Sequence, residues 1–327
     1  MINAFFNSLP QSVLQEVSQL NVETPSKDCY EEINSLLKRT VLLGGKRLRP
    51  LLTFLMGNLL NVNTEDLRPY ARAVELVHAA SLSHDDVIDN AEMRRGVPSI
   101  NILGSNKKAI LTGDYLLADV IVDLASLGNL ELVREMSLVI KDLAEGEWIQ
   151  LEAIEEKNYS WELIEKIAKK KTSSVMSYCC VAPAILAGHS DHVVSLCSQF
   201  GLNLGLGFQL MDDALDFKKS SAKDLKTDLK NGIVNAVTYS WLKKNPKLLD
   251  LYKQKGQSLS SLEEWIDGEG LHESINEVEE MAFEKLRKSK ANLKEIGLAL
   301  PSSALPGFQK ALPTLETVVD FLAKRTL

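Results

Sequence analysis

Apolar residues recur with the period of an α-helix along almost the whole chain, and the alternation typical of strands is almost absent. Helices are predicted over 2–20, 28–42, 50–60, 64–89, 107–126, 128–155, 160–187, 190–219, 231–243, 270–297 and 306–325. Ser160 and Thr64 are the predicted N-caps of two of them, because a hydroxyl can accept a free N–H of the first turn. No linker of Pro and Ser divides the chain. The sequence therefore predicts an all-α protein with a single domain over residues 1–327.

Composition excludes several classes of protein. The net charge of −7 and the pI near 5.4 argue against nucleic acid as a partner. The stretch 1–11 lacks the basic start of a secretory signal, and no apolar run appears long enough to span a membrane, so no transmembrane segment is expected. The four cysteines show no Cys-x-x-Cys spacing and are interpreted as free thiols. Free thiols predict a reducing compartment, the cytoplasm.

One acidic pattern occurs twice. Asp85-Asp86-Val87-Ile88-Asp89 is followed 127 residues later (212 − 85) by Asp212-Asp213-Ala214-Leu215-Asp216. The first and last Asp of each copy are four residues apart and share one face of a helix. Like charges at that spacing weaken a helix by roughly 0.2–0.5 kcal/mol per pair. Oxygen ligands of this kind suit Mg²⁺ ions that bridge to the phosphate groups of a substrate.

The helix that leads to the first copy leaves space beneath the carboxylates. Ala80, Ser81 and Val77, within the two turns before Asp85, are small or medium in size. Carboxylates above a narrow apolar shaft suit a substrate with a phosphate head and a hydrocarbon tail. Without the Asp residues, close packing between helices would be the better interpretation of these small side chains.

Basic residues lie near both sides of the first copy. Gly44-Gly45-Lys46-Arg47-Leu48-Arg49-Pro50 joins a flexible turn to three cations, and Arg94-Arg95-Gly96 follows the first copy closely. Guanidinium groups match phosphate oxygens in a bidentate manner, and Lys adds a point charge. Together with acidic metal ligands, these clusters suggest two anionic groups held at once, one through metal and one through direct cations.

Four other residues are less decisive on their own. Lys171-Thr172 interrupts an apolar helix, Gln209 lies one turn before Asp213, and His78 lies on the first Asp helix. Each is more readily explained by a structural role than by a functional one. A zinc site is not expected, because no Cys/His spacing fits.

Taken together, these motifs resemble those of the trans-isoprenyl diphosphate synthases, also called polyprenyl synthetases. The shared motifs, in the family's order, are Gly44-Gly45-Lys46-Arg47-x-Arg49-Pro50, Glu75-Leu76-x-His78, His84-Asp85-Asp86-x-x-Asp89 with Arg94-Arg95-Gly96, Gly113-Asp114-Tyr115-Leu116, Glu145-Gly146-Glu147-x-x-Gln150, Lys171-Thr172 and Phe208-Gln209-x-x-Asp212-Asp213-x-x-Asp216. The resemblance is strong over residues 40 to 240. It implies the isoprenoid synthase fold, a helical bundle around a central apolar cavity.

The resemblance also implies a reaction and its residues. The family joins an allylic diphosphate, here farnesyl or geranylgeranyl diphosphate, to isopentenyl diphosphate and releases pyrophosphate. Metal ligands on the allylic group, for an expected three Mg²⁺ ions, are Asp85, Asp89 and Asp212, with outer or water-mediated support from Asp86, Asp213 and Asp216. Residues expected to bind the allylic diphosphate are Arg94, Lys171, Thr172, Gln209 and Lys223. Residues expected to bind isopentenyl diphosphate are Lys46, Arg49, His78 and Arg95.

Small residues at Ala80 and Ser81, where the family's short-chain members have bulky ones, imply a product of at least five isoprene units, with Val77 too small to close the shaft. The stretch 222–229 departs from the family's usual loop, which leaves open whether Lys223 or Lys226 reaches the substrate. The alternatives are a farnesyl or geranylgeranyl diphosphate synthase, a terpene cyclase and a regulatory subunit of a heteromeric synthase. The family also implies a homodimer.

Overall fold

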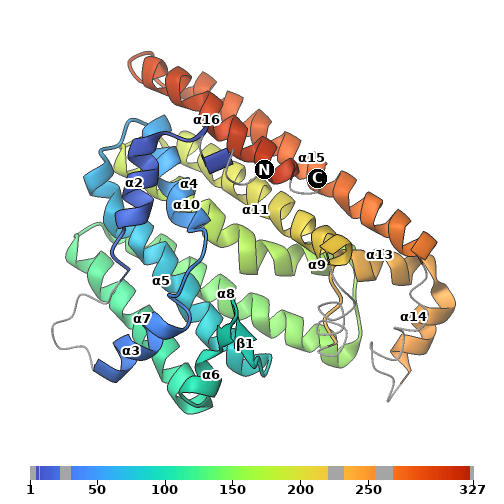
Figure 1. Ribbon diagram of the computed structural model, residues 1–327. Helices are drawn as coiled ribbons and strands as arrows, with labels where there is room; N and C mark the ends of the chain where they lie inside the picture. The colour runs from blue at the N-terminus through green and yellow to red at the C-terminus, as the bar shows by residue number, and fades with distance from the viewer. Residues whose placement is uncertain (1–4, 7, 23–30, 220–231, 255–267, 325–327) are drawn as a thin grey trace. The chain divides into compact units, whose positions relative to one another are not determined.

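The computed structural model describes residues 5, 6, 8–22, 31–219, 232–254 and 268–324, which are nearly all helical (Figure 1). The main helices are α2 (Gln11–Gln19), α3 (Glu31–Arg39), α4 (Leu48–Leu59), α5 (Thr64–Ile88), α6 (Ile100–Leu103), α7 (Asn106–Ser126), α8 (Leu130–Glu156), α9 (Trp161–Ala168), η1 (Lys169–Ser173), α10 (Ser174–Leu186), α11 (Asp191–Lys219), α13 (Ala236–Lys244), α14 (Pro246–Lys253), α15 (Gly268–Ala299) and α16 (Leu305–Ala323). The all-α prediction is confirmed.

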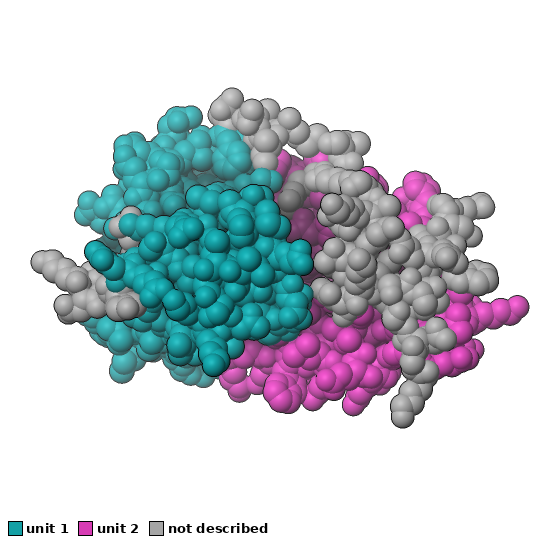
Figure 2. Space-filling view, turned by 60° about the horizontal axis from the view of Figure 1, so that its bottom comes forward, with its two compact units in different colours: residues 1–140, 178–194, 300–314 teal, residues 141–177, 195–299, 315–327 magenta. Residues whose placement is uncertain are grey.

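The chain divides into two compact units, coloured separately in Figure 2. Unit 1 comprises residues 1–140, 178–194 and 300–314, and unit 2 comprises residues 141–177, 195–299 and 315–327. The first Asp motif belongs to unit 1 and the second to unit 2. Each unit is described by itself.

One short hairpin interrupts the helices of unit 1. Strands β1 (Met93–Arg94) and β2 (Val97–Pro98) pair antiparallel, with Met93 opposite Pro98. Between them Arg95 and Gly96 have φ values of 52° and 81°, so the two-residue turn has the positive φ values of a type I′ turn, which matches the twist of paired strands. Residues 90–106 lie between two predicted helices, and the strands were not predicted, because two residues are too few to display alternation.

Helix α5, which carries the first Asp motif, packs mainly against α7 and α4. Its N-cap is Asn63, whose side chain accepts the N–H of Glu65 at 3.3 Å, so the prediction of Thr64 as the cap is wrong by one residue. The cap fixes the start of α5.

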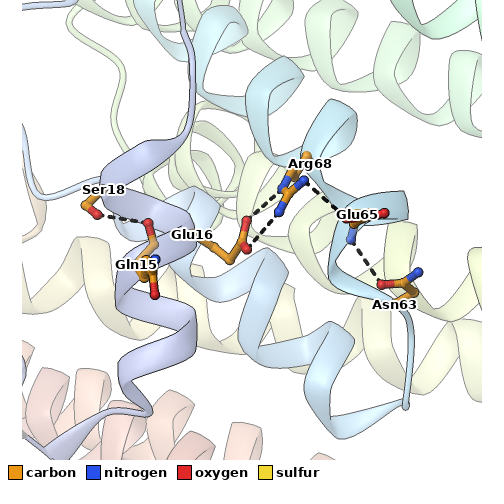
Figure 3. A network of polar contacts seen from close by, with 6 residues as sticks. All are labelled: Gln15, Glu16, Ser18, Asn63, Glu65 and Arg68. Atoms are coloured by element: carbon orange, nitrogen blue, oxygen red, sulfur yellow. Dashed lines mark hydrogen bonds and ion pairs between the residues drawn. The ribbon is translucent and has the colours of Figure 1, made fainter.

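Arg68 in α5 contacts α2 through a bidentate pair with Glu16, at 2.7 and 2.9 Å (Figure 3).

The stretch predicted as one helix over 160–187 comprises α9, η1 and α10. Ser160 caps its start by accepting the N–H of Leu163 at 3.2 Å, as predicted. The five residues of η1 form a π-helix, a local widening that is frequent at functional sites. Lys171 and Thr172 lie within it.

Helix α11 approaches η1 and α10 unusually closely within unit 2. A Cβ added to Gly205 would lie 2.6 Å from the Cα of Ser173, and one added to Gly201 would lie 2.5 Å from the Cα of Ser177. The two glycines on α11 are four residues apart, and so are the two serines that they face on η1 and α10. The four residues therefore form one line of close contact between the helices, called the seam. Only a residue without a Cβ allows this distance between the two backbones.

Helix α11 is the one helix in the described part of the chain that is long and apolar enough to cross a membrane. Its most apolar stretch of 18 residues has a mean hydropathy of 1.2, and 56% of that stretch is buried inside the protein. Buried helices in protein cores commonly have the same length and hydropathy, so this helix is weak evidence for a membrane span. Cys179, Cys180 and Cys197 are buried free thiols, as predicted.

Candidate active site

The first Asp motif lies at the C-terminal end of α5. Asp85 and Asp86 belong to its last turn, and Asp89 is the C-cap residue, whose N–H bonds to the carbonyl of Asp85 at 2.8 Å. Asp85 and Asp89 are half-buried. The C-terminal end of a helix carries partial negative charge, so carboxylates there are disfavoured unless cations offset them. The position therefore supports a cation site better than a structural role.

Asp86 differs from its neighbours because its side chain has no exposed surface. Its Oδ1 accepts the Nε–H of Arg94 at 2.6 Å, and its Oδ2 lies 3.5 Å from the backbone N of Ile100. The predicted substrate-binding Arg94 is thus engaged by a carboxylate in this structure.

The tip of the β1–β2 hairpin reaches the Gly-rich loop that precedes α4. Arg95 donates from Nη1 to the carbonyl of Leu43 at 3.1 Å, and its guanidinium lies 3.0 Å from where a Cβ on Gly45 would be. Gly44 and Gly45 have φ values of 71° and 96°, which only glycine adopts readily. The glycines therefore let a cation lie directly against the loop backbone.

The same loop places its cations differently from one another. Lys46 is exposed, and Arg49 is half-buried near the start of α4. Arg47 donates to the carbonyls of Val17 and Leu20, both at 3.0 Å, and so ties α2 to the loop. Of the three cations, Arg47 has the structural role.

A half-buried acid, Glu75, and a half-buried imidazole, His78, lie on α5 beside this cluster. Burial raises the pKa of Glu75 above its ordinary value, against the lowering effect of Arg49, Arg47 and Arg95. Burial, followed by the nearby arginines, lowers the pKa of His78 well below 6.5. His78 is therefore neutral near pH 7 and can donate one hydrogen bond without adding charge.

The face of α5 beneath the first motif is mostly inaccessible to solvent. Val77 and Ala80 have no exposed surface. Ser81 is half-buried, and its hydroxyl donates to the carbonyl of His78 at 2.9 Å. Because that hydroxyl is satisfied within its own helix, Ser81 presents little polarity to its surroundings.

The second Asp motif lies within the last turns of α11. Met211, Ala214 and Leu215 pack into the core of unit 2, which leaves Asp212 half-buried and Asp216 exposed. Helical geometry therefore repeats the arrangement of the first motif, with its outer carboxylates on the accessible side.

Asp213 is buried, and both of its oxygens accept hydrogen bonds. Gln209 donates from Nε2 to Oδ1 at 2.8 Å, and the backbone N–H of Ala236 donates to Oδ2 at 3.0 Å. Burial raises the pKa of Asp213 to about 7, against the lowering effect of these two bonds, and the charges of Asp216 and Asp212 raise it further. The structure thus connects three of the predicted residues, because Thr172 donates to Oε1 of Gln209 at 2.7 Å.

Lys171 has partners that the sequence analysis did not assign. Its Nζ forms an ion pair with Glu147 and lies 3.2 Å from Oε1 of Gln150. Gly146 permits this approach, since a Cβ there would lie 2.8 Å from the Cγ of Lys171. The Glu145–Gln150 motif was a signal for these partners, although its spacing alone does not say which cation it holds.

Lys223, Lys226 and the rest of the altered loop lie outside the described residues. Within the described ranges, no group of three or more His, Cys, Asp or Glu side chains is arranged to hold a metal ion.

Comparison with known proteins identifies the family. The polyprenyl synthetase model matches residues 30–267, so the chain belongs to the polyprenyl synthetase family. It is 36% identical over 265 residues to a mitochondrial solanesyl-diphosphate synthase of Oryza sativa, covering 75% of this chain and 62% of that protein. It is 35% identical over 288 residues to a decaprenyl-diphosphate synthase of Dictyostelium discoideum, covering 86% and 61%. The chain therefore spans less than two thirds of the length of these two relatives.

Solved structures agree on the fold. A polyprenyl synthase from Caulobacter crescentus, solved in complex with calcium and isoprenyl diphosphate, superimposes with a TM-score of 0.80 at 25% identity, covering 97% of this chain and 96% of that one. A heptaprenyl diphosphate synthase from Staphylococcus aureus gives a TM-score of 0.82 at 23% identity, covering 97% and 98%. The predicted isoprenoid synthase fold is confirmed.

Proposed function

We propose that this protein is a prenyltransferase that elongates an allylic diphosphate with isopentenyl diphosphate, head to tail, and releases pyrophosphate. The product is an all-trans polyprenyl diphosphate of five or more isoprene units. The observation that carries this proposal is the presence of both Asp motifs, each with accessible outer carboxylates, in a member of the polyprenyl synthetase family. Residues 1–327 would act as one isoprenoid synthase domain.

Asp85, Asp89 and Asp212 are the proposed ligands of three Mg²⁺ ions on the allylic diphosphate. Their half-buried carboxylates provide the hard oxygen donors that Mg²⁺ prefers. Bound Mg²⁺ would supply Lewis-acid stabilisation of the pyrophosphate leaving group. Asp216 would support the site from the exposed side of α11.

The residues proposed to bind substrate would divide between two diphosphates. Arg94, Lys171, Thr172, Gln209 and, outside the described residues, Lys223 are proposed for the allylic group. Lys46, Arg49, His78 and Arg95 are proposed for isopentenyl diphosphate. Positive charge next to a leaving pyrophosphate stabilises the charge that develops as the carbon–oxygen bond breaks. Support comes from the contact of Arg95 with the Gly-rich loop that carries Lys46.

Product length would be set beneath the first motif by Ala80, Ser81 and Val77. Each further turn of α5 adds about 5.4 Å of depth, comparable to one isoprene unit. Ala80→Phe is expected to shorten the product, because a phenyl ring would block the shaft at its first turn. Product sizing by reversed-phase chromatography tests this, with Leu298→Phe on the exposed end of α15 as the control. An unchanged product from Ala80→Phe would refute the role of that position.

The proposed homodimer has a candidate surface on α7. Leu111, Ala118 and Val122 lie seven and four residues apart, on one line of the helix, and Leu111 and Val122 are 64% and 67% exposed. Leu111→Asp with Val122→Asp is expected to yield a monomer in analytical ultracentrifugation. Leu298→Asp, also on an exposed leucine, should leave the dimer intact. A double variant that remains dimeric excludes this face.

The central experiment incubates the protein with Mg²⁺, farnesyl diphosphate and labelled isopentenyl diphosphate, followed by extraction and sizing of the products. A labelled product of five or more units supports the proposal, and Asp85→Asn should reduce its rate by at least two orders of magnitude. A labelled product that stops at four units would indicate a geranylgeranyl diphosphate synthase, the short-chain alternative that this primer can reveal. A cyclic hydrocarbon without incorporated label would indicate a terpene cyclase. Activity that appears only with a second subunit would indicate a regulatory role.

The cytoplasmic location stays a prediction. The buried free thiols support a reducing compartment. The names of the rice relative and of the chloroplastic or mitochondrial relatives in Arabidopsis thaliana refer to organelles. Fractionation of cells that express the tagged protein would distinguish these compartments.

A further inference from the structure

The second Asp of each motif is placed differently from the other two. Asp86 has no exposed side-chain surface and Asp213 is 7% exposed, whereas the first and third Asp of each motif are half-buried or exposed. A residue that follows the first Asp is turned by about 100° around the helix, away from the face that positions i and i+4 share. Each motif therefore directs two carboxylates toward the accessible side and one into the protein.

Asp86 connects the β1–β2 hairpin and the start of α6 to α5. One oxygen accepts from Arg94 in β1, and the other faces the backbone N–H of Ile100, the first residue of α6. The hairpin between these two contacts carries Arg95 at its tip, where it donates to Leu43 beside the Gly-rich loop. A change at Asp86 would therefore be transmitted to the cations proposed for isopentenyl diphosphate.

Asp213 makes the corresponding contacts in unit 2. One oxygen accepts from Gln209, and the other accepts from the backbone N–H of Ala236, the first residue of α13. Gln209 in turn accepts from Thr172 in η1. A change at Asp213 would therefore be transmitted to residues proposed for the allylic diphosphate.

We propose that Asp86 and Asp213 are positioning residues, each of which anchors the segment that follows its motif. Asp86 fixes the hairpin that presents Arg95, and Asp213 fixes Gln209, Thr172 and the start of α13. Both oxygens of each carboxylate already have donors in the protein, and neither carboxylate needs a cation to be satisfied. The inference rests on the proposed function, since the diphosphates it concerns are those of the prenyl transfer.

The two anchors predict different kinetic effects. An Asn side chain offers one acceptor oxygen and one NH2 group, so Asp86→Asn and Asp213→Asn each lose one of the two contacts. Asp86→Asn is expected to raise the KM for isopentenyl diphosphate about tenfold and, through its direct partner Arg94, also the KM for the allylic substrate. Asp213→Asn should raise only the KM for the allylic substrate, by a similar factor. Neither should shift the Mg²⁺ concentration for half-maximal rate. The matched variants Asp89→Asn and Asp212→Asn should shift it about tenfold or more.

Hydrogen–deuterium exchange tests the anchors without reference to activity. Peptides covering residues 93–104 and 232–240 should be protected in the wild-type protein. The first should exchange about tenfold faster in Asp86→Asn, and the second in Asp213→Asn, with peptides from 109–120 unchanged as the internal control. In the wild-type protein, Mg²⁺ alone should leave both peptides protected, a measurement that does not depend on the folding of a variant.

The outcomes separate the two proposals. If Asp86→Asn or Asp213→Asn shifts the Mg²⁺ dependence as far as its control does, or if Mg²⁺ accelerates exchange of these peptides in the wild type, the anchoring role is overturned. Unchanged exchange in both variants overturns it as well. A wild-type protein without prenyl transfer, whose variants still show the faster exchange, refutes the proposed function and leaves the anchors in place.

Discussion

The seam between η1 and α11 allows a prediction in which two effects oppose each other. Alanine favours a helix interior over glycine by up to about 1 kcal/mol, so Gly205→Ala would stabilise an isolated helix. In the protein, the new Cβ would lie 2.6 Å from the Cα of Ser173 and 2.9 Å from its Oγ. Carbon atoms in contact are normally about 3.5–4.0 Å apart. The two helices would have to separate by close to 1 Å, because the Cα cannot rotate away.

Overpacking of this kind typically costs about 1–3 kcal/mol. After the gain in helix propensity, we expect a net loss of up to roughly 2 kcal/mol in the free energy of unfolding. For a chain of 327 residues, that loss lowers Tm by up to roughly 3 °C. The separation would also stretch the 2.7 Å bond from Thr172 to Gln209 beyond hydrogen-bonding distance, so the KM for the allylic substrate should rise.

Differential scanning calorimetry of the purified variant measures this effect. Gly207→Ala is the matched control, because it lies on the same helix but its Cβ would meet mainly the side chain of Leu286, at 2.7 Å, and a backbone atom only at 3.2 Å, the carbonyl oxygen of Ala282. A leucine side chain can change rotamer, so a smaller loss is expected. An increase in Tm for Gly205→Ala, or equal losses in the two variants, would refute the argument that contact with the backbone decides the sign.

Three further predictions concern other parts of the chain. Burial raises the pKa of Cys179 and of Cys197 to about 12, so at pH 8 only about one thiol in 10⁴ is ionised. A thiol reagent should therefore label neither cysteine until the protein unfolds. Peptide mapping by mass spectrometry measures the labelling. Arg72 bridges Asp119 and Asp123 with a side chain only 12% exposed, although Asp123 is 33% exposed. Arg72→Ala should therefore cost about 1.5–3 kcal/mol, whereas Arg68→Ala, which breaks an exposed pair, should cost less than about 1 kcal/mol. Urea titration compares the two losses, and equal losses would contradict the argument from burial. The pKa of His78 in the folded protein lies well below 6.5, so below that pH unfolding takes up a proton. The free energy of unfolding therefore falls as the pH drops below about 6.5, by up to about 1.4 kcal/mol per pH unit. His78→Gln should remove this contribution between pH 6.5 and 5, and an unchanged pH dependence would show that His78 is not its source.

Much of the architecture followed from local patterns. Helical periodicity identified the long helices, because a buried stripe at a spacing of 3.6 residues is a property of the sequence itself. The π-helix η1 was not predicted, since its widening has no distinct periodicity. Strands β1 and β2 were missed for a related reason. Asp86 contacts Arg94 in β1 and the backbone N–H of Ile100 after β2, residues 8 and 14 positions away, and no local pattern reveals such contacts.

The sequence by itself determined the family, the two Asp motifs and the identity of the cations, because residue type and order fix the available chemistry. Only the tertiary structure decided which carboxylates of each motif are accessible and which are buried. Asp86 and Asp213 have the same side chain as their neighbours, yet burial and two hydrogen-bond donors make them anchors. The donors at Ile100 and Ala236 are backbone groups brought close by folding, and no sequence pattern identifies a partner 14 or 23 residues away.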